Sequence, residues 1–118
     1  NNTGMVLNVA FDYGGRNDIV EATKIVTSKV LSGEIMIDEV DEVYLQNHLY
    51  VTSNIDLLIR TSGEVRLSNF MLWQLAYTEF WFTDTLWPDF DEGCLLDAIE
   101  TFQKRNRRYG GIKEEETN

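Results

Sequence analysis

Apolar and polar residues follow one another in blocks that predict strands separated by helices. Residues 5–11 form an almost continuous apolar run, which is typical of an interior strand of a parallel sheet. A loop with two glycines follows at residues 12–16. A shorter apolar run at residues 57–59 and an aromatic run at residues 79–82 also have the length of strands. Because buried strands alternate with helices, the pattern predicts an α/β fold built on a mostly parallel sheet flanked by helices.

Two helices are predicted in the first half of the chain. The first has Asn17 or Asp18 as its N-cap, carries apolar residues at helical spacing, and ends before Gly33 in the usual C′ position. The second is shorter and runs from its cap at Asp38 to about Leu49.

Two further helices are predicted in the second half. Ser68-Asn69 supplies the N-cap of one, which runs to about residue 77. Asp91 caps the other, which runs from residue 92 to about residue 109. Only three strands are visible in the pattern, and parallel sheets rarely stand as three strands with open edges. The chain is therefore expected to be part of a larger sheet.

The loop after the second predicted strand has the residues of an anion site. Gly63 permits backbone angles that other residues avoid, so the loop can fold back on itself. Arg60 and Arg66 flank this glycine, and arginine grips a phosphate through two parallel hydrogen bonds. Together with the helix N-terminus expected at Ser68, these groups predict a phosphate or diphosphate cradle. The alternative for either residue is a solvated surface arginine or a structural salt bridge.

The formal net charge of the 118 residues is −10, which argues against a nucleic-acid-binding protein because such proteins carry a basic face. Any anion site must therefore be local, and the arginines gather at Arg16, at positions 60 and 66, and between positions 105 and 108. Cys94 is the single cysteine, so a disulfide framework is excluded and a reducing compartment is indicated. No apolar run approaches the length of a membrane span, and a cytoplasmic protein is expected.

Short motifs that combine glycine, arginine and aromatic residues follow one another along the chain. They are Asn8-Val9-Ala10, Tyr13-Gly14-Gly15-Arg16, Ile59-Arg60-Thr61-Ser62-Gly63-Glu64, Arg66-Leu67-Ser68-Asn69-Phe70, Trp73-Gln74, Leu86-Trp87-Pro88-Asp89-Phe90 and Arg107-Arg108-Tyr109-Gly110-Gly111. This ordered series resembles the cis-prenyltransferases, the undecaprenyl and dehydrodolichyl diphosphate synthases, over essentially residues 3–111. It is similar to the C-terminal half of such an enzyme, so residues 1–111 are expected to be that half-domain and residues 112–118 a charged, disordered tail.

The resemblance implies an enzyme that adds isopentenyl diphosphate to farnesyl diphosphate or another short allylic diphosphate, each addition creating a cis double bond. It implies Mg²⁺ as the cofactor that assists departure of the allylic diphosphate, and a parallel sheet wrapped by helices around a hydrophobic tunnel. The enzyme is expected to be a homodimer. Contact with a membrane is expected only at its periphery, through apolar surface near the tunnel mouth.

The resemblance also implies roles for residues of the anion loop. Arg60 and Arg66 would bind the diphosphate of isopentenyl diphosphate, Ser68 would donate a hydroxyl hydrogen bond to it, and Leu67 would contribute its backbone. The arginines would thereby hold the nucleophilic alkene beside the allylic carbon, which is catalysis by positioning and electrostatics. A pure N-cap role is the alternative for Ser68.

Other implied roles lie outside that loop. Glu79 matches a carboxylate that helps hold magnesium, a cation that prefers oxygen ligands; its alternative is a strand-end carboxylate paired with an arginine. Arg108 and Gly110 match a feature that reaches across the dimer interface to the partner's isopentenyl site. Met5 matches an apolar position at the far end of the tunnel. The family's catalytic aspartate, in an Asp-Gly-Asn-x-Arg loop, has no match and is expected upstream of Asn1.

Two other functions compete with an active transferase. A non-catalytic scaffold subunit of a heteromeric enzyme would resemble this half too, but such subunits tend to lose the arginine and serine residues kept here. A generic nucleotide-phosphate domain would need a Walker or dinucleotide glycine pattern, which the chain lacks. With half of the active site on other residues, the 118 residues alone are expected to be inactive.

Overall fold

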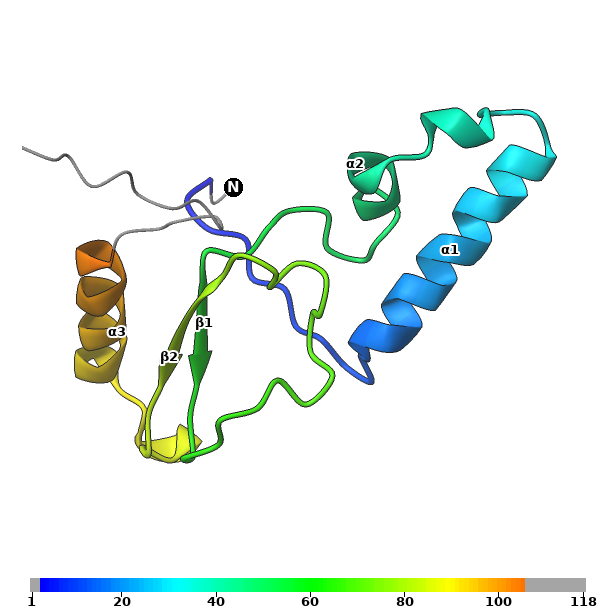
Figure 1. The fold of residues 1–118 in the computed structure, drawn as a ribbon. Coiled ribbons are helices and arrows are strands. Elements are labelled where there is room, and N and C mark those ends of the chain that lie inside the picture. Colours follow the sequence, from blue (N-terminus) through cyan, green and yellow to red (C-terminus); the bar gives the residue numbers. More distant parts are fainter. Residues whose placement is uncertain (1–2, 106–118) are drawn as a thin grey trace, which may run out of the picture. The chain divides into compact units, whose positions relative to one another are not determined.

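The structure, a computed structural model, describes residues 3–105, and the chain divides into two compact units. The first unit comprises residues 1–52 and 68–73, and the second comprises residues 53–67 and 74–118. Figure 1 follows the elements along the chain. They are α1 (Gly15–Leu31), the 3-10 turn η1 (Ile37–Glu39), α2 (Glu42–Gln46), β1 (Leu57–Arg60), β2 (Glu79–Phe82), the 3-10 turn η2 (Trp87–Asp89) and α3 (Glu92–Lys104).

The first unit is built on α1. This helix begins at Gly15 with Gly14 as its N-cap, so the predicted caps Asn17 and Asp18 lie inside the helix and that prediction is wrong. The predicted end is confirmed, because Gly33 follows the last turn with a φ of +78°. The buried apolar residues of this unit are Ala22, Val26, Leu49 and Met71.

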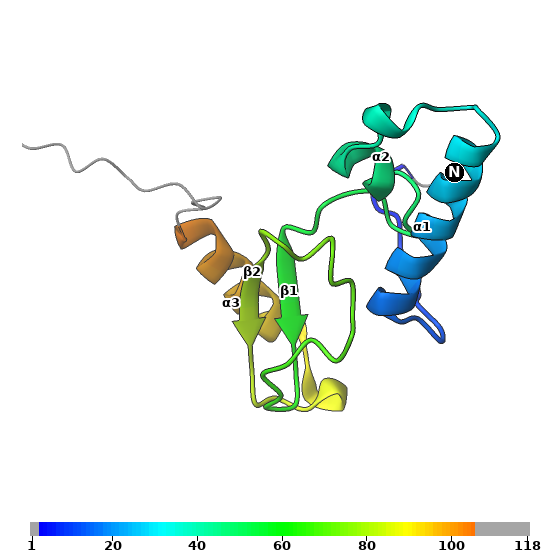
Figure 2. The ribbon, with the colours of Figure 1, turned by 45° about the vertical axis from the view of Figure 1, so that its right-hand side comes forward.

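The predicted helix from Asp38 to Leu49 is divided into η1 and α2. Val40 lies between them in an extended conformation, so the helix cannot continue through it. The cap of α2 is Asp41 rather than Asp38: its side chain accepts a hydrogen bond from the backbone N of Tyr44 at 2.7 Å. Figure 2 shows α2 lying alongside α1.

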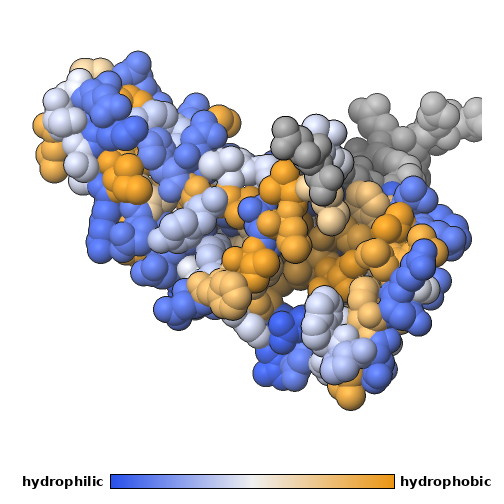
Figure 3. Space-filling model, turned by 180° about the vertical axis from the view of Figure 1, so that it is seen from behind, coloured by the Kyte–Doolittle hydropathy of each residue, from blue (hydrophilic) through white to orange (hydrophobic). Residues whose placement is uncertain are grey.

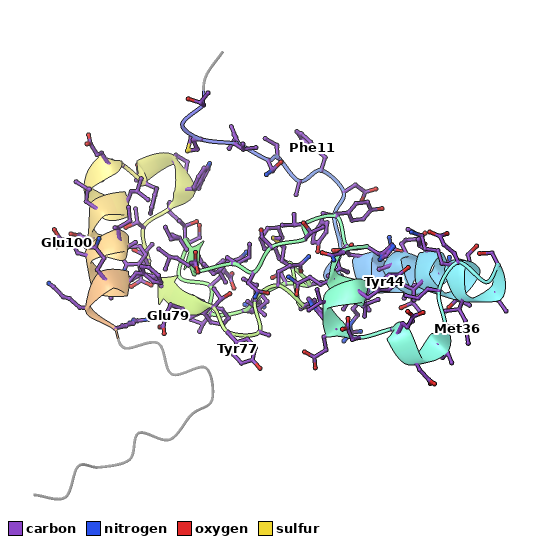
Figure 4. All side chains as sticks on the ribbon, turned by 90° about the horizontal axis from the view of Figure 1, so that it is seen from above. Phe11, Met36, Tyr44, Tyr77, Glu79 and Glu100 are labelled. Atoms are coloured by element: carbon purple, nitrogen blue, oxygen red, sulfur yellow. The ribbon has the colours of Figure 1, made fainter. Side chains whose placement is uncertain are left out.

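Residues 5–11 do not form the predicted strand. They are an irregular segment whose residues are all exposed, and Met5 is 82% exposed. Figure 4 shows Phe11 projecting from this segment. A strand is held by hydrogen bonds to a neighbouring strand, and within residues 3–105 no strand pairs with this segment. The apolar pattern identified a segment suited to a sheet, but it did not identify the neighbour that a strand requires.

β1 and β2 form a two-stranded parallel sheet in the second unit, which confirms both strands and the α/β class. Leu57 pairs with Glu79 and Arg60 pairs with Phe82, so the two strands start and end together. Figure 2 shows α3 beside β2, against which it packs. The strand residues are half-buried, apart from the exposed Phe82, so the predicted burial on both faces is not reached within the described residues.

Residues 68–77 form consecutive turns rather than the predicted helix. Ser68, Asn69 and Met71 have φ angles of +50°, +63° and +45°. A right-handed helix needs a negative φ at each residue, so these left-handed residues prevent it. Ser68 is therefore not a helix N-cap, and the predicted helix N-terminus at this position does not contribute to an anion site.

α3 begins where the sequence predicts and ends earlier. Asp91 Oδ1 accepts a hydrogen bond from Cys94 N at 2.9 Å, which confirms the predicted N-cap. The helix ends at Lys104, and Arg105 after it is extended. The rest of the predicted helix and the charged tail lie outside the described residues.

Apolar side chains remain on the surface of the second unit. Leu95, Leu96 and Ile99 of α3 are exposed, as is Trp87. Figure 3 shows broad hydrophobic areas over this unit on one face of the molecule. Apolar surface of this extent is typical of a face that packs against other protein.

Among the helices within residues 3–105, none combines the length and the apolar character needed to cross a bilayer.

Candidate anion-binding site

We define the anion loop as residues 61–67. Its start is held by backbone hydrogen bonds that its N–H groups donate to carbonyl oxygens of the residues after β2. Ser62 N donates to Thr85 O at 2.9 Å, and Gly63 N donates to Thr83 O at 3.0 Å. Ser62 and Gly63 both have a φ of +68°, so the loop turns back sharply as predicted. Glycine adopts this angle without strain, which is why it suits the tip of the turn.

Arg60 is the last residue of β1 and leads into the anion loop. Its Nε atom is buried and has no hydrogen-bond partner within the part of the chain that the structure describes. A buried donor without a partner costs about 1–3 kcal/mol, and more when the group is charged. Arg60 is thus a cation whose hydrogen-bonding capacity a phosphate oxygen would complete.

Arg66 lies at the other side of the loop and is 70% exposed in its side chain. Its Nη2 atom pairs with Glu64 Oε2 at 2.6 Å. An exposed ion pair of this kind contributes about 0–1 kcal/mol, because water screens it and two side chains must be ordered. A multiply charged anion can therefore displace Glu64 from Arg66. The Arg66 guanidinium is thus accessible for the diphosphate binding that the sequence predicts.

Leu67 and Ser68 follow Arg66, and the boundary between the compact units falls between them. Leu67 is half-buried, whereas Ser68 is exposed in a left-handed conformation. The structure therefore groups Arg60, Arg66 and Leu67 in one unit and places Ser68 in the other. The role of the Ser68 hydroxyl stays a prediction.

Glu79 opens β2, as Figure 4 marks, and its carboxylate is partnered. Arg105 Nη1 lies 3.3 Å from Glu79 Oε2, and the Glu79 side chain is 24% exposed. In the β1–β2 register, Glu79 pairs with Leu57 rather than with Arg60. Glu79 and Arg60 are thus at opposite ends of the sheet, about 10 Å apart along the strands, with their side chains on opposite faces. The structure does not bring these two predicted site residues together.

Glu79 fits magnesium as one ligand of a shared site. Within residues 3–105, no three His, Cys, Asp or Glu side chains gather closely enough to hold a metal ion. Magnesium commonly binds through one or two carboxylates together with substrate phosphates, so a single carboxylate suits it. The ion pair with Arg105 also matches the alternative reading of Glu79, a strand-end carboxylate held by an arginine.

The remaining predicted site residues are Met5, Arg108 and Gly110. Met5 is exposed and is not among the residues that line an open hollow of about 480 Å³ in the first unit. That hollow is formed by residues 8–14 together with Tyr50 and Phe70 among others. Arg108 and Gly110 lie outside the described residues, so their predicted roles stay predictions.

Sequence reasoning assigned two polar residues of the first unit to helix caps and missed the contacts that they make. Asp18 is only 2% exposed, and its carboxylate accepts hydrogen bonds from Tyr13 OH at 2.8 Å and from Tyr50 N at 3.0 Å. Asn69 Oδ1 accepts a hydrogen bond from Arg16 N at 2.9 Å. Asparagine is one of the few residues that adopt left-handed angles readily, and that preference is the signal that could have found Asn69.

Comparison with known proteins gives matches over nearly the whole chain. The family described as “Putative undecaprenyl diphosphate synthase” matches residues 1–110. An isoprenyl transferase of Halalkalibacterium halodurans is 57% identical over 114 residues, which cover 94% of this chain and 44% of the relative. The ditrans,polycis-undecaprenyl-diphosphate synthase ((2E,6E)-farnesyl-diphosphate specific) of Vibrio cholerae is 52% identical over 111 residues, 92% of this chain and 44% of the relative.

A solved structure shares the fold. Lavandulyl diphosphate synthase from Lavandula x intermedia, in complex with dimethylallyl diphosphate, superposes with a TM-score of 0.78 and 50% sequence identity. The match covers 83% of this chain and 43% of that one. The chain therefore spans less than half the length of the relatives that it matches.

Proposed function

The chain belongs to the undecaprenyl diphosphate synthase family of cis-prenyltransferases, and on that premise we propose that the whole protein condenses isopentenyl diphosphate with an allylic diphosphate to build a cis-polyprenyl diphosphate. The anion loop carries the proposal, because it sets Arg60 and Arg66 on either side of a left-handed turn. Since the chain spans less than half of its relatives, we assign to it a part of the active site, the isopentenyl diphosphate half-site.

Each of the two arginines has hydrogen-bond donors that one diphosphate could use. Arg60 has a buried Nε without a partner among the described residues, and Arg66 is held only by an exposed pair with Glu64. A diphosphate would accept from the first and displace the carboxylate from the second through charge-assisted hydrogen bonds. Ser68 would add its hydroxyl, and Leu67 its backbone. Bound in this way, the substrate keeps its alkene in place for attack on the allylic carbon.

The allylic partner is inferred from the names of the relatives. One relative is named as specific for (2E,6E)-farnesyl diphosphate, and the solved relative is in complex with dimethylallyl diphosphate. We propose a farnesyl-type diphosphate for this protein.

Mg²⁺ would assist departure of the allylic diphosphate, with Glu79 as one oxygen ligand and a catalytic aspartate from a part of the whole protein upstream of Asn1. Replacement of Glu79 by Gln should raise the magnesium concentration needed for half-maximal activity; an unchanged requirement would leave Glu79 as the partner of Arg105.

Other features of the whole enzyme complete the proposal. Residues 1–111 would be the C-terminal half of its single catalytic domain. The enzyme would be a homodimer in which Arg108 and Gly110 reach the partner's isopentenyl site. It would work in the cytoplasm and meet the membrane at its periphery, where apolar surface receives the product.

The decisive experiment replaces Arg66 in the whole protein. Arg66→Ala should raise KM for isopentenyl diphosphate by at least about tenfold, because a hydrogen bond to a charged group contributes about 1.5–3 kcal/mol. KM for the allylic diphosphate should not change. Arg66→Lys should give an intermediate KM, since lysine keeps the charge and lacks the planar fork. Lys24→Ala is the matched control, because Lys24 is an exposed cation on α1 whose partner is Glu21.

Two results would reject the assignment. Unchanged kinetics in Arg66→Ala would exclude the anion loop as the isopentenyl site. A whole protein that binds isopentenyl diphosphate but supports turnover only with a second subunit would be a scaffold subunit instead. We also propose that residues 1–118 alone make no product, and polyprenyl product from that purified fragment would contradict this.

A further inference from the structure

Two motifs far apart in the sequence are joined at the start of α1. Asn69 Oδ1 accepts a hydrogen bond from Arg16 N at 2.9 Å, across a separation of 53 residues. The Asn69 backbone O also accepts one from Gly15 N. These two N–H groups belong to the first turn of α1, whose N-cap residue, Gly14, has no side chain to accept from them. Asn69 thus caps α1 from a distant part of the chain.

The Asn69 segment packs so closely against the start of α1 that there is no room for a side chain at Gly14 or Gly15. A Cβ atom on Gly15 would lie 2.9 Å from the Asn69 backbone O and 2.9 Å from Leu72 Cγ. A Cβ atom on Gly14 would lie 3.0 Å from Asn69 Nδ2. The glycine pair therefore permits close approach of the Asn69 segment, which explains its presence better than a tight turn does.

The segment that reaches α1 is held in an unfavourable backbone conformation. Ser68 and Asn69 both have left-handed φ angles, as does Met71. A left-handed residue other than glycine or asparagine costs about 1–3 kcal/mol and persists only where the surroundings fix it, which applies to Ser68 and Met71. The two hydrogen bonds to α1 and the contact with the glycine pair are the surroundings that fix Asn69, and with it the peptide that joins Ser68 to Asn69.

We propose that Asn69 is a positioning residue for substrate binding: by capping α1 it fixes the left-handed conformation of Ser68 and so directs the Ser68 hydroxyl to the isopentenyl diphosphate. This inference rests on the proposed function. Asn69 itself does not touch substrate in this scheme, because its side-chain oxygen is bonded to Arg16 N. The N–H groups of Gly15 and Arg16 at the start of α1 are in turn occupied by Asn69.

The test is a double-mutant cycle in the whole protein, with Asn69→Gly and Ser68→Ala. Glycine keeps the left-handed backbone and the backbone oxygen, so Asn69→Gly removes only the side-chain acceptor. It should raise KM for isopentenyl diphosphate about fivefold, as expected for one lost hydrogen bond, with KM for the allylic diphosphate unchanged. In the Ser68→Ala background it should raise KM no further, because the hydroxyl that it positions is gone. Asn54→Gly, in the exposed segment before β1, is the control.

The outcomes separate this inference from the proposed function. If neither Ser68→Ala nor Arg66→Ala changes KM, the isopentenyl half-site is misplaced. If both raise KM and Asn69→Gly does not, or if Asn69→Gly raises it equally in the Ser68→Ala background, Asn69 is not a positioning residue. Should Asn69→Gly fail to fold, Asn69→Asp keeps the acceptor and should retain folding and a KM within about twofold of the wild type; a KM as high as that of Ser68→Ala would overturn the proposal.

Discussion

The two glycine loops of this chain have the same predicted context and different structures. Both are predicted to connect a buried strand to a helix. The first, around Gly15, leads into α1 but follows an exposed segment without strand structure. The second, around Gly63, follows β1 but leads into turns instead of a helix. Each loop therefore keeps one of its two predicted neighbours.

The difference shows what each kind of element needs. β1 forms because β2 supplies its hydrogen bonds in parallel register, and residues 5–11 have no such partner within the described part of the chain. α1 forms because its apolar face is covered and its first turn is capped by Asn69. Residues 68–77 cannot follow the same course, because the residue that caps α1 is left-handed. The same residue, Asn69, therefore caps α1 and interrupts the helix predicted at residues 68–77.

The largest expected effect comes from filling the space beside Gly15. In Gly15→Ala the new Cβ atom would meet the Asn69 backbone O, which cannot turn aside as a side chain could. Overpacking of this kind typically costs about 1–3 kcal/mol, and we expect a loss of about 2 kcal/mol in the free energy of unfolding, measured with urea in the whole protein. Gly4→Ala is the control, since a Cβ there meets nothing within 4 Å. Equal stability of the two variants would show that the Asn69 segment does not pack closely against Gly15.

A smaller effect is expected at Gly63, where the constraint is the backbone angle. Gly63→Ala should lower the free energy of unfolding by about 1 kcal/mol, because an L-residue with a φ of +68° is strained. The added Cβ would lie 3.1 Å from Asp84 Oδ1, at the end of a side chain that can shift. Gly63→Asn introduces the same Cβ but tolerates the angle, so it should recover part of the loss. If Asn is as destabilising as Ala, space rather than strain decides at Gly63.

The smallest effect is a pH dependence of local stability, which is expected at the start of α3 and not at the start of α1. Asn69 caps α1 with an amide, which does not titrate, whereas Asp91 caps α3 with a carboxylate. The hydrogen bond from Cys94 N lowers the pKa of Asp91 below its ordinary value of 3.8. The stabilisation is therefore complete above that value and is lost as the pH falls through the lowered pKa of the folded state.

Amide hydrogen exchange near pH 3 would measure this difference. Faster exchange is expected in the first turn of α3 relative to Asp91→Asn, which keeps an acceptor without a titrating charge, while the first turn of α1 should not respond. If acid accelerates amide exchange in the first turn of α3 equally in Asp91→Asn and in the wild type, protonation of Asp91 is not the cause of the acceleration.

Local signals predicted the parts of the fold that are locally determined. The Asp91 cap and the Gly33 terminus depend on residues close in sequence, and both are confirmed. The strands at Leu57 and Glu79 are also confirmed, because each has the other as its hydrogen-bonded neighbour. Two of the failures involve partners at a distance. Residues 5–11 lack a strand neighbour, and the helix expected at Ser68 was replaced by a contact with a segment 53 positions earlier.

The candidate site divides in the same way. Arg60, Gly63 and Arg66 could be found because a strand end, a glycine and two arginines lie within a few positions of one another. Asn69 could not be predicted as the cap of α1. Its preference for left-handed angles does not indicate which distant residue it contacts. The separation of Glu79 from Arg60 depends on sheet register, which the residue pattern of two short strands does not fix.

The contact between Asn69 and Arg16 also has a consequence for the order of folding events. Closing a chain of 53 residues costs about 3.5 kcal/mol in entropy, so we expect this contact to form after α1 and the β1–β2 pair. A contact that is absent from the transition state affects the unfolding rate and leaves the folding rate nearly unchanged. Stopped-flow kinetics of Asn69→Gly should therefore show faster unfolding, and slower folding would contradict this. Asn69 would then set how long the segment from Ser68 onward stays joined to the start of α1.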